Sequence, residues 1–200
     1  MSRVANAVLG VVALAEFNTK KSVQAAAVIL KEQPNQRMSF YHLLKLLYIA
    51  DRESLGETRF PIIGDVACAM DKGPLHSTIY DFIKGLSGGK VTDHYWQKHV
   101  KREGNNLVLT SDPGEDELCP YEVHKLREIC ARPIGKNSRL ASRESHGYAE
   151  FLLHHTPGTS SPIPLKDILS AVGRRTEADK LAKTIKGYAA LEQQLRGAGE

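Results

Sequence analysis

The segment Ser39-Phe-Tyr-His-Leu-Leu-Lys-Leu-Leu-Tyr-Ile-Ala-Asp-Arg-Glu-Ser54 carries the clearest helical pattern in this chain of 200 residues. Four apolar residues recur at the i, i+3, i+4 and i+7 spacing of one α-helical face: Leu43, Leu46, Leu47 and Ala50. Ser39 suits a helix N-cap, and Gly56 is a residue type that commonly ends helices. We therefore expect a helix over about 40–54, with this apolar face packed into a core.

The opposite face of this helix is mostly polar. Its members keep helical spacing among themselves: His42, Lys45, Tyr48 and Arg52. A lysine or arginine there could pair with a carboxylate of a partner, and a tyrosine could supply buried contact area. An alternative stays open at this point, in which Tyr48 packs internally and Lys45 is solvated.

The rest of the chain predicts more helix than strand. We expect further helices over 22–33, 74–85, 120–133, 138–155, 165–172 and 176–196. A short strand or ordered loop fits 60–70, and a β-hairpin fits about 96–110, with Gly104-Asn105 as its turn. The predicted class is mainly α (α+β): a compact helical domain with a small β-hairpin and a C-terminal helical extension.

Composition changes only once along the chain, at the Pro/Ser/Thr-rich segment 156–164. We expect one domain over 1–155 with its core at about 20–155, then this connector, then a helical appendage over 165–200. The apolar run Ala7–Ala15 is expected to be a first helix of the domain. A short secretory signal is the alternative, because the run follows Arg3 and ends in an A-x-A pattern.

Charge and cysteine content exclude several classes of protein. The net charge of +4 is too small to indicate nucleic-acid binding by itself. Three cysteines without a C-x-x-C pair suggest neither a disulfide framework nor a zinc site, so a reducing cytoplasm is the expected location. The longest apolar run has nine residues, well short of the roughly 20 that span a bilayer, so no membrane partner is expected.

Motifs for catalysis are weak throughout. The Gly-rich stretch 85–90 lacks the glycine spacing and the Ser/Thr of a phosphate-binding loop. His146 and Glu150 share a helical face, but no third metal ligand follows at a suitable spacing. No strand-to-helix nucleophile elbow is visible. We therefore expect no enzyme activity, no cofactor and no metal.

The predicted hairpin offers a second functional hypothesis. Its aromatic residues Tyr95 and Trp96 lie near three cations: Lys98, Lys101 and Arg102. Such a hairpin could act as the wing of a winged-helix DNA binder that represses its own operon, with the cations meeting phosphates. A core role for Trp96, or a protein partner at the same surface, competes with this interpretation.

Several motifs in order along the chain resemble the Panacea domain, the SocA-like antitoxin domain. They are Leu43–Arg52, Gly64-Asp65, Ala69–Ser77 with its Gly73-Pro74 pair, Tyr80-Asp81 and Leu140–His146. The resemblance covers about residues 20–155. Leu44 stands where many members carry Gln, Met70 where many carry Trp, and Ser145 where Thr is usual.

This resemblance implies a mainly helical, non-enzymatic antitoxin that neutralises a cognate toxin by direct binding. Such pairs are often encoded side by side and frequently in prophages, and one member hands its toxin to a ClpXP-type protease. The candidates for partner binding are His42, Lys45, Tyr48, Arg52, Tyr80 and Trp96. The expected structural motif residues are Leu46, Leu47, Asp51, Gly73, Pro74, Asp81 and His146. Among these, Gly73-Pro74 should form a turn and start a helix, and Asp81 should hold a backbone amide.

Overall fold

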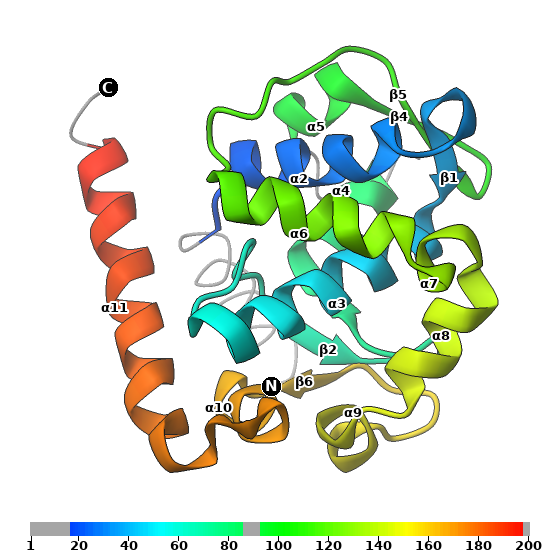
Figure 1. Cartoon of the computed structure of the whole chain (residues 1–200). Coiled ribbons are helices and arrows are strands. Elements are labelled where there is room, and N and C mark those ends of the chain that lie inside the picture. Colours follow the sequence, from blue (N-terminus) through cyan, green and yellow to red (C-terminus); the bar gives the residue numbers. More distant parts are fainter. Residues whose placement is uncertain (1–16, 86–92, 198–200) are drawn as a thin grey trace, which may run out of the picture.

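The computed structural model describes residues 17–85 and 93–197 (Figure 1). The predictions for Ala7–Ala15 and for the Gly-rich stretch beyond Gly85 lie outside these residues. Within them the chain is mainly helical, with two small antiparallel sheets of three strands each. This confirms the predicted mainly α class with minor β structure. No helix in the described ranges is long and apolar enough to cross a membrane.

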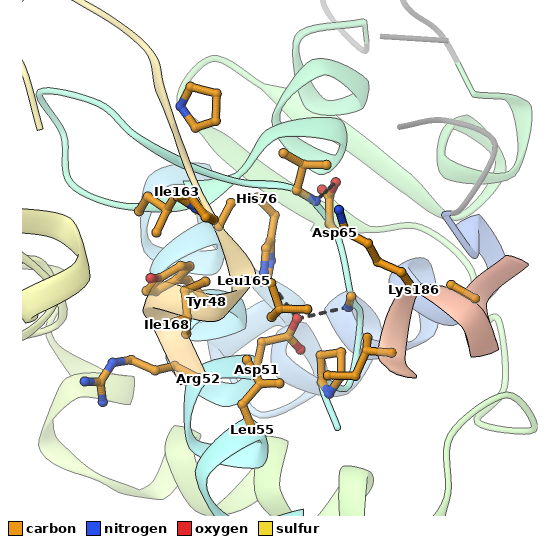
Figure 2. A pocket seen from close by; sticks show the side chains of 18 residues that line it. Tyr48, Asp51, Arg52, Leu55, Asp65, His76, Ile163, Leu165, Ile168 and Lys186 are labelled. Carbon is orange, nitrogen blue, oxygen red and sulfur yellow. Dashed lines mark hydrogen bonds and ion pairs between the residues drawn. The ribbon is translucent and has the colours of Figure 1, made fainter. Parts of the chain in front are cut away.

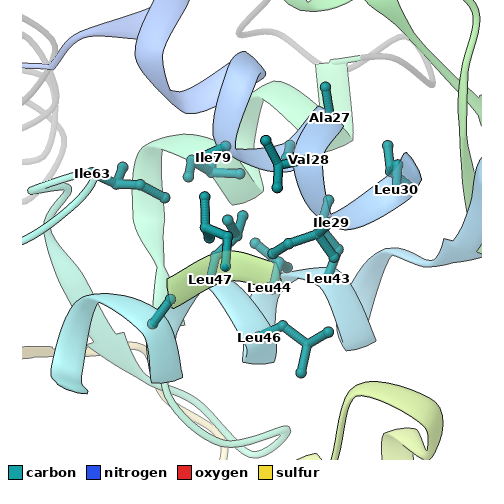
Figure 3. Close-up of a cluster of buried hydrophobic side chains, with 14 of the residues drawn as sticks. Ala27, Val28, Ile29, Leu30, Leu43, Leu44, Leu46, Leu47, Ile63 and Ile79 are labelled. Atoms are coloured by element: carbon teal, nitrogen blue, oxygen red, sulfur yellow. The ribbon is translucent and has the colours of Figure 1, made fainter. Parts of the chain in front are cut away.

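Helix α3 (Phe40–Thr58) lies at the centre of the molecule, with α2 (Thr19–Lys31) and α6 (Pro120–Ala131) packed against it (Figure 1). Their apolar side chains form the main core, which includes Leu46 and Leu47 with no exposed surface (Figure 3). The predicted helix end at Gly56 is wrong. The helix continues to Thr58 and ends at Arg59, whose φ is +71°; Gly56 lies within it and faces the Val172 side chain.

The first sheet has the order β1-β5-β4, with β1 (Arg37–Ser39), β5 (Asn106–Leu109) and β4 (Val100–Glu103). The predicted hairpin is present but shorter than 96–110. Residues His94–His99 instead form helix α5, because the Asp93 side chain caps it by accepting a hydrogen bond from Trp96 N at 3.0 Å. Trp96 therefore lies on a helix rather than on the hairpin.

The second sheet has the order β3-β2-β6, with β3 (Leu75–His76), β2 (Ala67–Ala69) and β6 (Ser161–Ile163). The predicted strand over 60–70 is reduced to three residues. Pro74 does not start a helix, since β3 follows it and α4 (Ser77–Gly85) begins afterwards. Strand β6 lies inside the predicted connector and pairs with β2, so this segment is ordered against the body.

The C-terminal half contains shorter helices: α7 (Pro133–Lys136), α8 (Ser138–His146), α9 (Ala149–His154) and α10 (Leu165–Leu169). The single helix predicted over 138–155 is broken at Gly147-Tyr148. After a π turn (Ser170–Arg174) and a 3₁₀ turn (Arg175–Glu177), α11 (Ala178–Gly197) runs along one side of the body (Figure 1). A second apolar cluster joins α10 and α11 to α3 through Leu169, Ile185 and Leu55.

Candidate protein-interaction site

The polar face of α3 is covered by other parts of the chain. His42 Nε2 lies 2.7 Å from the Ile134 carbonyl oxygen. Lys45 Nζ donates a hydrogen bond to the Pro74 carbonyl oxygen at 2.6 Å. Burial lowers the pKa of Lys45 to about 7. These contacts make the predicted solvated or partner-facing side of the helix part of the interior.

Gly73 brings three separate motifs together. Its backbone has φ +89°, a conformation that favours glycine. A β-carbon there would lie 2.8 Å from His146 Cε1 and 3.0 Å from Lys45 Nζ. His146 is held in place because its Nδ1 lies 2.6 Å from the Ser142 carbonyl oxygen. These residues therefore form a close-packed junction between α3, the turn before β3 and α8.

Tyr48 and Arg52 both bind Glu150, a buried residue of α9. Arg52 Nε donates to Glu150 Oε1 at 2.7 Å, and Tyr48 Oη donates to the same oxygen at 3.1 Å. The Arg52 guanidinium also lies 3.9 Å from the centre of the Tyr148 ring, in cation–π geometry. This cluster ties α9 to α3.

Asp51 organises the segment that follows α3. Its Oδ1 accepts hydrogen bonds from the backbone amides of Ile62 and Ile63 at 2.9 and 2.8 Å, and its Oδ2 accepts one from Gly64 at 3.0 Å. Oδ2 also lies 3.3 Å from His76 Nε2 (Figure 2). A carboxylate with this many donors is a structural anchor.

The expected role of Asp81 is taken by Asp65. Asp65 Oδ2 accepts a hydrogen bond from Ile79 N, in the first turn of α4, at 3.0 Å. Asp81 instead forms an exposed ion pair with Lys84 at 3.0 Å. The reason is position. Asp81 lies within α4, where backbone amides donate to carbonyl groups of the same helix, whereas Asp65 lies next to the first turn of α4, where the amides lack such acceptors.

The six candidates for partner binding differ in exposure. His42, Lys45, Tyr48 and Trp96 are at most 7% exposed. Trp96 has no exposed surface, and its Nε1 donates to Ser22 Oγ at 3.2 Å. Arg52 and Tyr80 are partly exposed, and Lys84 Nζ lies 4.5 Å from the Tyr80 ring centre. In this conformation only Arg52 and Tyr80 of the six offer appreciable surface to a partner.

Exposed apolar side chains elsewhere were missed by the sequence reasoning. The large ones are Phe60, Val66, Leu152, Leu153, Tyr188 and Leu191. Phe60 and Tyr188 contact each other edge to face, with ring centres 5.8 Å apart. We call Phe60, Tyr188 and Leu191 the α11 patch. A signal was present in the sequence for Leu191, which falls away from the buried stripe of α11 that contains Ala178 and Ile185, but not for Tyr188, which follows Ile185 at the same-face i+3 spacing.

Three lysines accompany this patch along α11. Lys180, Lys183 and Lys186 recur at every third position and are exposed. Across the described ranges, no acidic group lies within ion-pair distance of any of them. None of these lysines stands three or four positions from Tyr188 or Leu191, so α11 presents its cations and its exposed apolar residues on different faces.

The hairpin cations are less available than the DNA hypothesis requires. Lys101 Nζ lies 3.5 Å from Glu103, which also pairs with Arg37. The Arg102 guanidinium lies 4.5 Å from the Phe40 ring centre. Within residues 17–85 and 93–197, no group of three His, Cys, Asp or Glu side chains could hold a metal ion.

Together these features define a mainly helical domain in which several motif residues, Lys45, Asp51 and Gly73 among them, are buried, and whose C-terminal helix is one of the places where apolar and cationic side chains are exposed. The family model for the antitoxin SocA-like, Panacea domain matches residues 43–149, more than half of the chain. The chain therefore belongs to the SocA-like antitoxin Panacea family. The match begins in α3 and ends at the start of α9, so α10 and α11 lie beyond it. No curated protein and no solved structure matches the chain.

Proposed function

We propose that this chain is a non-enzymatic antitoxin that neutralises a cognate toxin by direct protein–protein binding, and that the toxin docks on the α11 patch. Family membership supports the antitoxin role. The main support for this docking surface is the exposure of Tyr188 and Leu191, at 56% and 50%, on a helix whose exposed lysines form no ion pair among the described residues. Specific interfaces concentrate their binding energy in such aromatic and aliphatic anchors.

The motif residues have a different part in this proposal. Lys45, Gly73 and His146 are packed against one another, and Arg52 is paired with Glu150. They hold the scaffold, and α11 presents the contact surface from outside the region matched by the family model. This division allows the contact surface to change between relatives while the fold is kept.

The test uses co-expression of the full chain with the product of the adjacent gene. We expect the chain to restore growth and to co-purify with that protein. Leu191→Asp places a charge in the α11 patch and should weaken binding at least about tenfold, equivalent to about 1.4 kcal/mol. Leu153→Asp is the matched control, because Leu153 is also exposed, at 69%, but lies on α9.

The outcomes separate two parts of the proposal. If Leu153→Asp weakens binding and Leu191→Asp does not, the toxin docks on α9 and the α11 site is wrong. If the unaltered chain neither restores growth nor forms a complex, the antitoxin proposal fails for that partner.

Hand-over of the bound toxin to a ClpXP-type protease is a finer proposal drawn from the family. It requires the toxin half-life in cells to shorten when the antitoxin is present, and to lengthen again when the protease is removed. Simple occlusion leaves the half-life unchanged. The DNA-binding alternative stays a prediction; it requires a salt-dependent shift of the operon's promoter DNA that is lost when Lys98, Lys101 and Arg102 become Ala.

A further inference from the structure

A cavity of about 240 Å³ lies between the body and the C-terminal helices (Figure 2). It is bounded by α3, the segment 61–67, β6, α10 and α11. Its walls are largely apolar, with contributions from Leu55, Ala67, Ile163, Leu165, Ile168 and Ile185. Several lining residues are themselves exposed, Val66 at 42% among them, so the cavity is the deep part of a groove that opens to the surface.

The two carboxylates in the lining already have donors. Asp51 accepts hydrogen bonds from three backbone amides. Asp65 accepts from the amides of Val66 and Ile79 at 2.6 and 3.0 Å. The exposed Lys186 of α11 points toward Asp65 and supplies a cation on that side (Figure 2). What the groove leaves uncovered is therefore mainly apolar surface, which suits aliphatic side chains.

The chain supplies an apolar segment of its own. Residues 4–15, which lie outside the described residues, read Val-Ala-Asn-Ala-Val-Leu-Gly-Val-Val-Ala-Leu-Ala. They contain no charged side chain, and all but Asn6 and Gly10 are Ala, Val or Leu. Leaving such a run in water is unfavourable, so we expect it to find an apolar surface.

The start of the described chain lies near the groove. Phe17 packs on Phe82 of α4, with ring centres 5.8 Å apart. Ile79 lies one turn earlier on α4, and its amide donates to Asp65 in the cavity lining. These contacts place Phe17 within about 20 Å of the lining, a distance that about six extended residues span at roughly 3.3 Å each. The apolar segment is therefore long enough to reach the groove and lie along it.

We infer that residues 4–15 dock within their own chain, in the groove between α11 and the segment 61–67, with one or two aliphatic side chains in the cavity. The volume sets this number, because a cavity of about 150 Å³ holds benzene. Leu9 and Leu14, the largest side chains of the run, bury the most apolar surface there. The other residues of the run cover the exposed side chain of Val66 at the rim.

Docking at this place links the N-terminal segment to the α11 patch. Phe60 of that patch precedes the lining residue Pro61 and contacts Tyr188, so the patch borders the groove. A segment docked in the groove would compete with a toxin for this border, a consequence that rests on the proposed function. The docking itself does not rest on it.

The experiment records methyl NMR spectra of the full chain, whose mass confirms that residues 1–16 are present. The reporters are the δ-methyl groups of Ile168 and Ile185 in the cavity wall, and the internal reference is Ile29 in the main core. We expect nuclear Overhauser effects between these two wall isoleucines and Val or Leu methyl groups of residues 4–15. A mixture of separately labelled chains should give none, because the contact lies within one chain.

Leu9→Asp places a charge in the middle of the apolar run. It should remove these Overhauser effects, shift the Ile168 and Ile185 methyl signals and leave the Ile29 signal in place. Ser2→Asp is the matched control, because it adds the same charge outside the run and should behave as the unaltered chain does.

Ala189→Asp alters the groove from the side of α11. Ala189 lines the cavity, whereas Ala190 is exposed and does not. Docking should slow amide hydrogen exchange in residues 4–15 at least about tenfold relative to Leu9→Asp, and Ala189→Asp should abolish this protection. Ala190→Asp should keep it. Trp96 fluorescence checks that each variant is folded.

Three results would overturn the inference. They are the absence of Overhauser effects between residues 4–15 and the wall isoleucines, Overhauser effects that arise between chains in the mixed sample, and full protection of residues 4–15 in Ala189→Asp. The second result would indicate docking on another copy of the chain. These measurements use no toxin, so their failure and the failure of the antitoxin proposal are distinguishable.

Discussion

Arg52 and Glu150 are 98 residues apart in the chain and form an ion pair at 2.7 Å in which the glutamate side chain has no exposed surface. Tyr48 donates to the same carboxylate oxygen. The pair fixes α9 on α3, so a residue one position beyond the region matched by the family model sets the position of two polar side chains of the central helix. It also explains why Arg52 has little freedom to meet a partner.

Removal of this carboxylate should be costly. Glu150→Ala leaves the Arg52 charge and the Tyr48 hydroxyl without their shared acceptor. We expect the free energy of unfolding to fall by about 3–5 kcal/mol, as when one partner of a buried pair is lost, measured by urea denaturation. Asp81→Ala is the control: it breaks the exposed pair with Lys84 and should cost less than about 1 kcal/mol. Equal losses would contradict the assigned role of Glu150.

Lys45 should make stability depend on pH. Its pKa is about 7 in the folded chain and about 10.5 when unfolded, so the unfolded state holds the proton more tightly. Stability should therefore rise with pH between about 7 and 10.5 and show no Lys45 dependence well below 7. Lys45→Met removes this effect. The free energy of unfolding of the variant minus that of the unaltered chain should be about 3 kcal/mol more positive at pH 7 than at pH 10, because only the unaltered chain gains stability over this range.

Lys125 provides the contrast for this measurement. Burial lowers its pKa, but hydrogen bonds to Glu128 and Glu57 outweigh burial and raise the pKa above 10.5. Its contribution is fully present below the unfolded value and is lost only as pH rises through the higher folded value. Lys125→Met should therefore change stability by nearly the same amount at pH 7 and at pH 9. A similar pH dependence for both variants would contradict the burial of Lys45 without a carboxylate partner.

Gly73 should tolerate no side chain. Gly73→Ala adds a β-carbon within 2.8 Å of His146 Cε1 at a backbone φ of +89°. Gly104→Ala is the matched control, since Gly104 also has positive φ, +62°, but nothing lies within 4 Å of its β-carbon position. We expect a loss of about 1 kcal/mol for Gly104→Ala and at least twice that for Gly73→Ala, by thermal unfolding. His146→Ala should recover part of the Gly73→Ala loss; no recovery would show that the contact with His146 is not the cause.

The C-terminal helices should unfold together with the body. Leu169 of α10 has no exposed surface and shares an apolar cluster with Leu55 of α3. Trp96 is the single tryptophan and lies in the other cluster, so its fluorescence reports on the main core. Leu169→Ala should lower the stability measured by Trp96 by about 2–5 kcal/mol. An unchanged Trp96 transition would show that 165–200 is an independent appendage.

Local patterns predicted several elements well. The spacing of Leu43, Leu46 and Leu47 is sufficient to predict α3, because helical periodicity is a property of neighbouring residues. Helical spacing likewise predicts α6 after Pro120, and the local turn residues at Gly104 predict the hairpin. The predictions failed at ends and breaks: α3 passes through Gly56, α5 replaces the start of the hairpin, and Gly147 interrupts 138–155. These depend on capping and packing contacts with distant residues.

The sequence by itself therefore determined the helical class, the apolar face of α3 and the family motifs. Tertiary structure alone decided that the polar face of α3 is interior, because its covering groups, Pro74, Ile134 and Glu150, come from three distant segments. It also decided that β6 completes a sheet and that Tyr188 and Leu191 remain exposed. A residue's spacing fixes its direction on a helix, but burial depends on which other segment packs there, and that is set by long-range contacts.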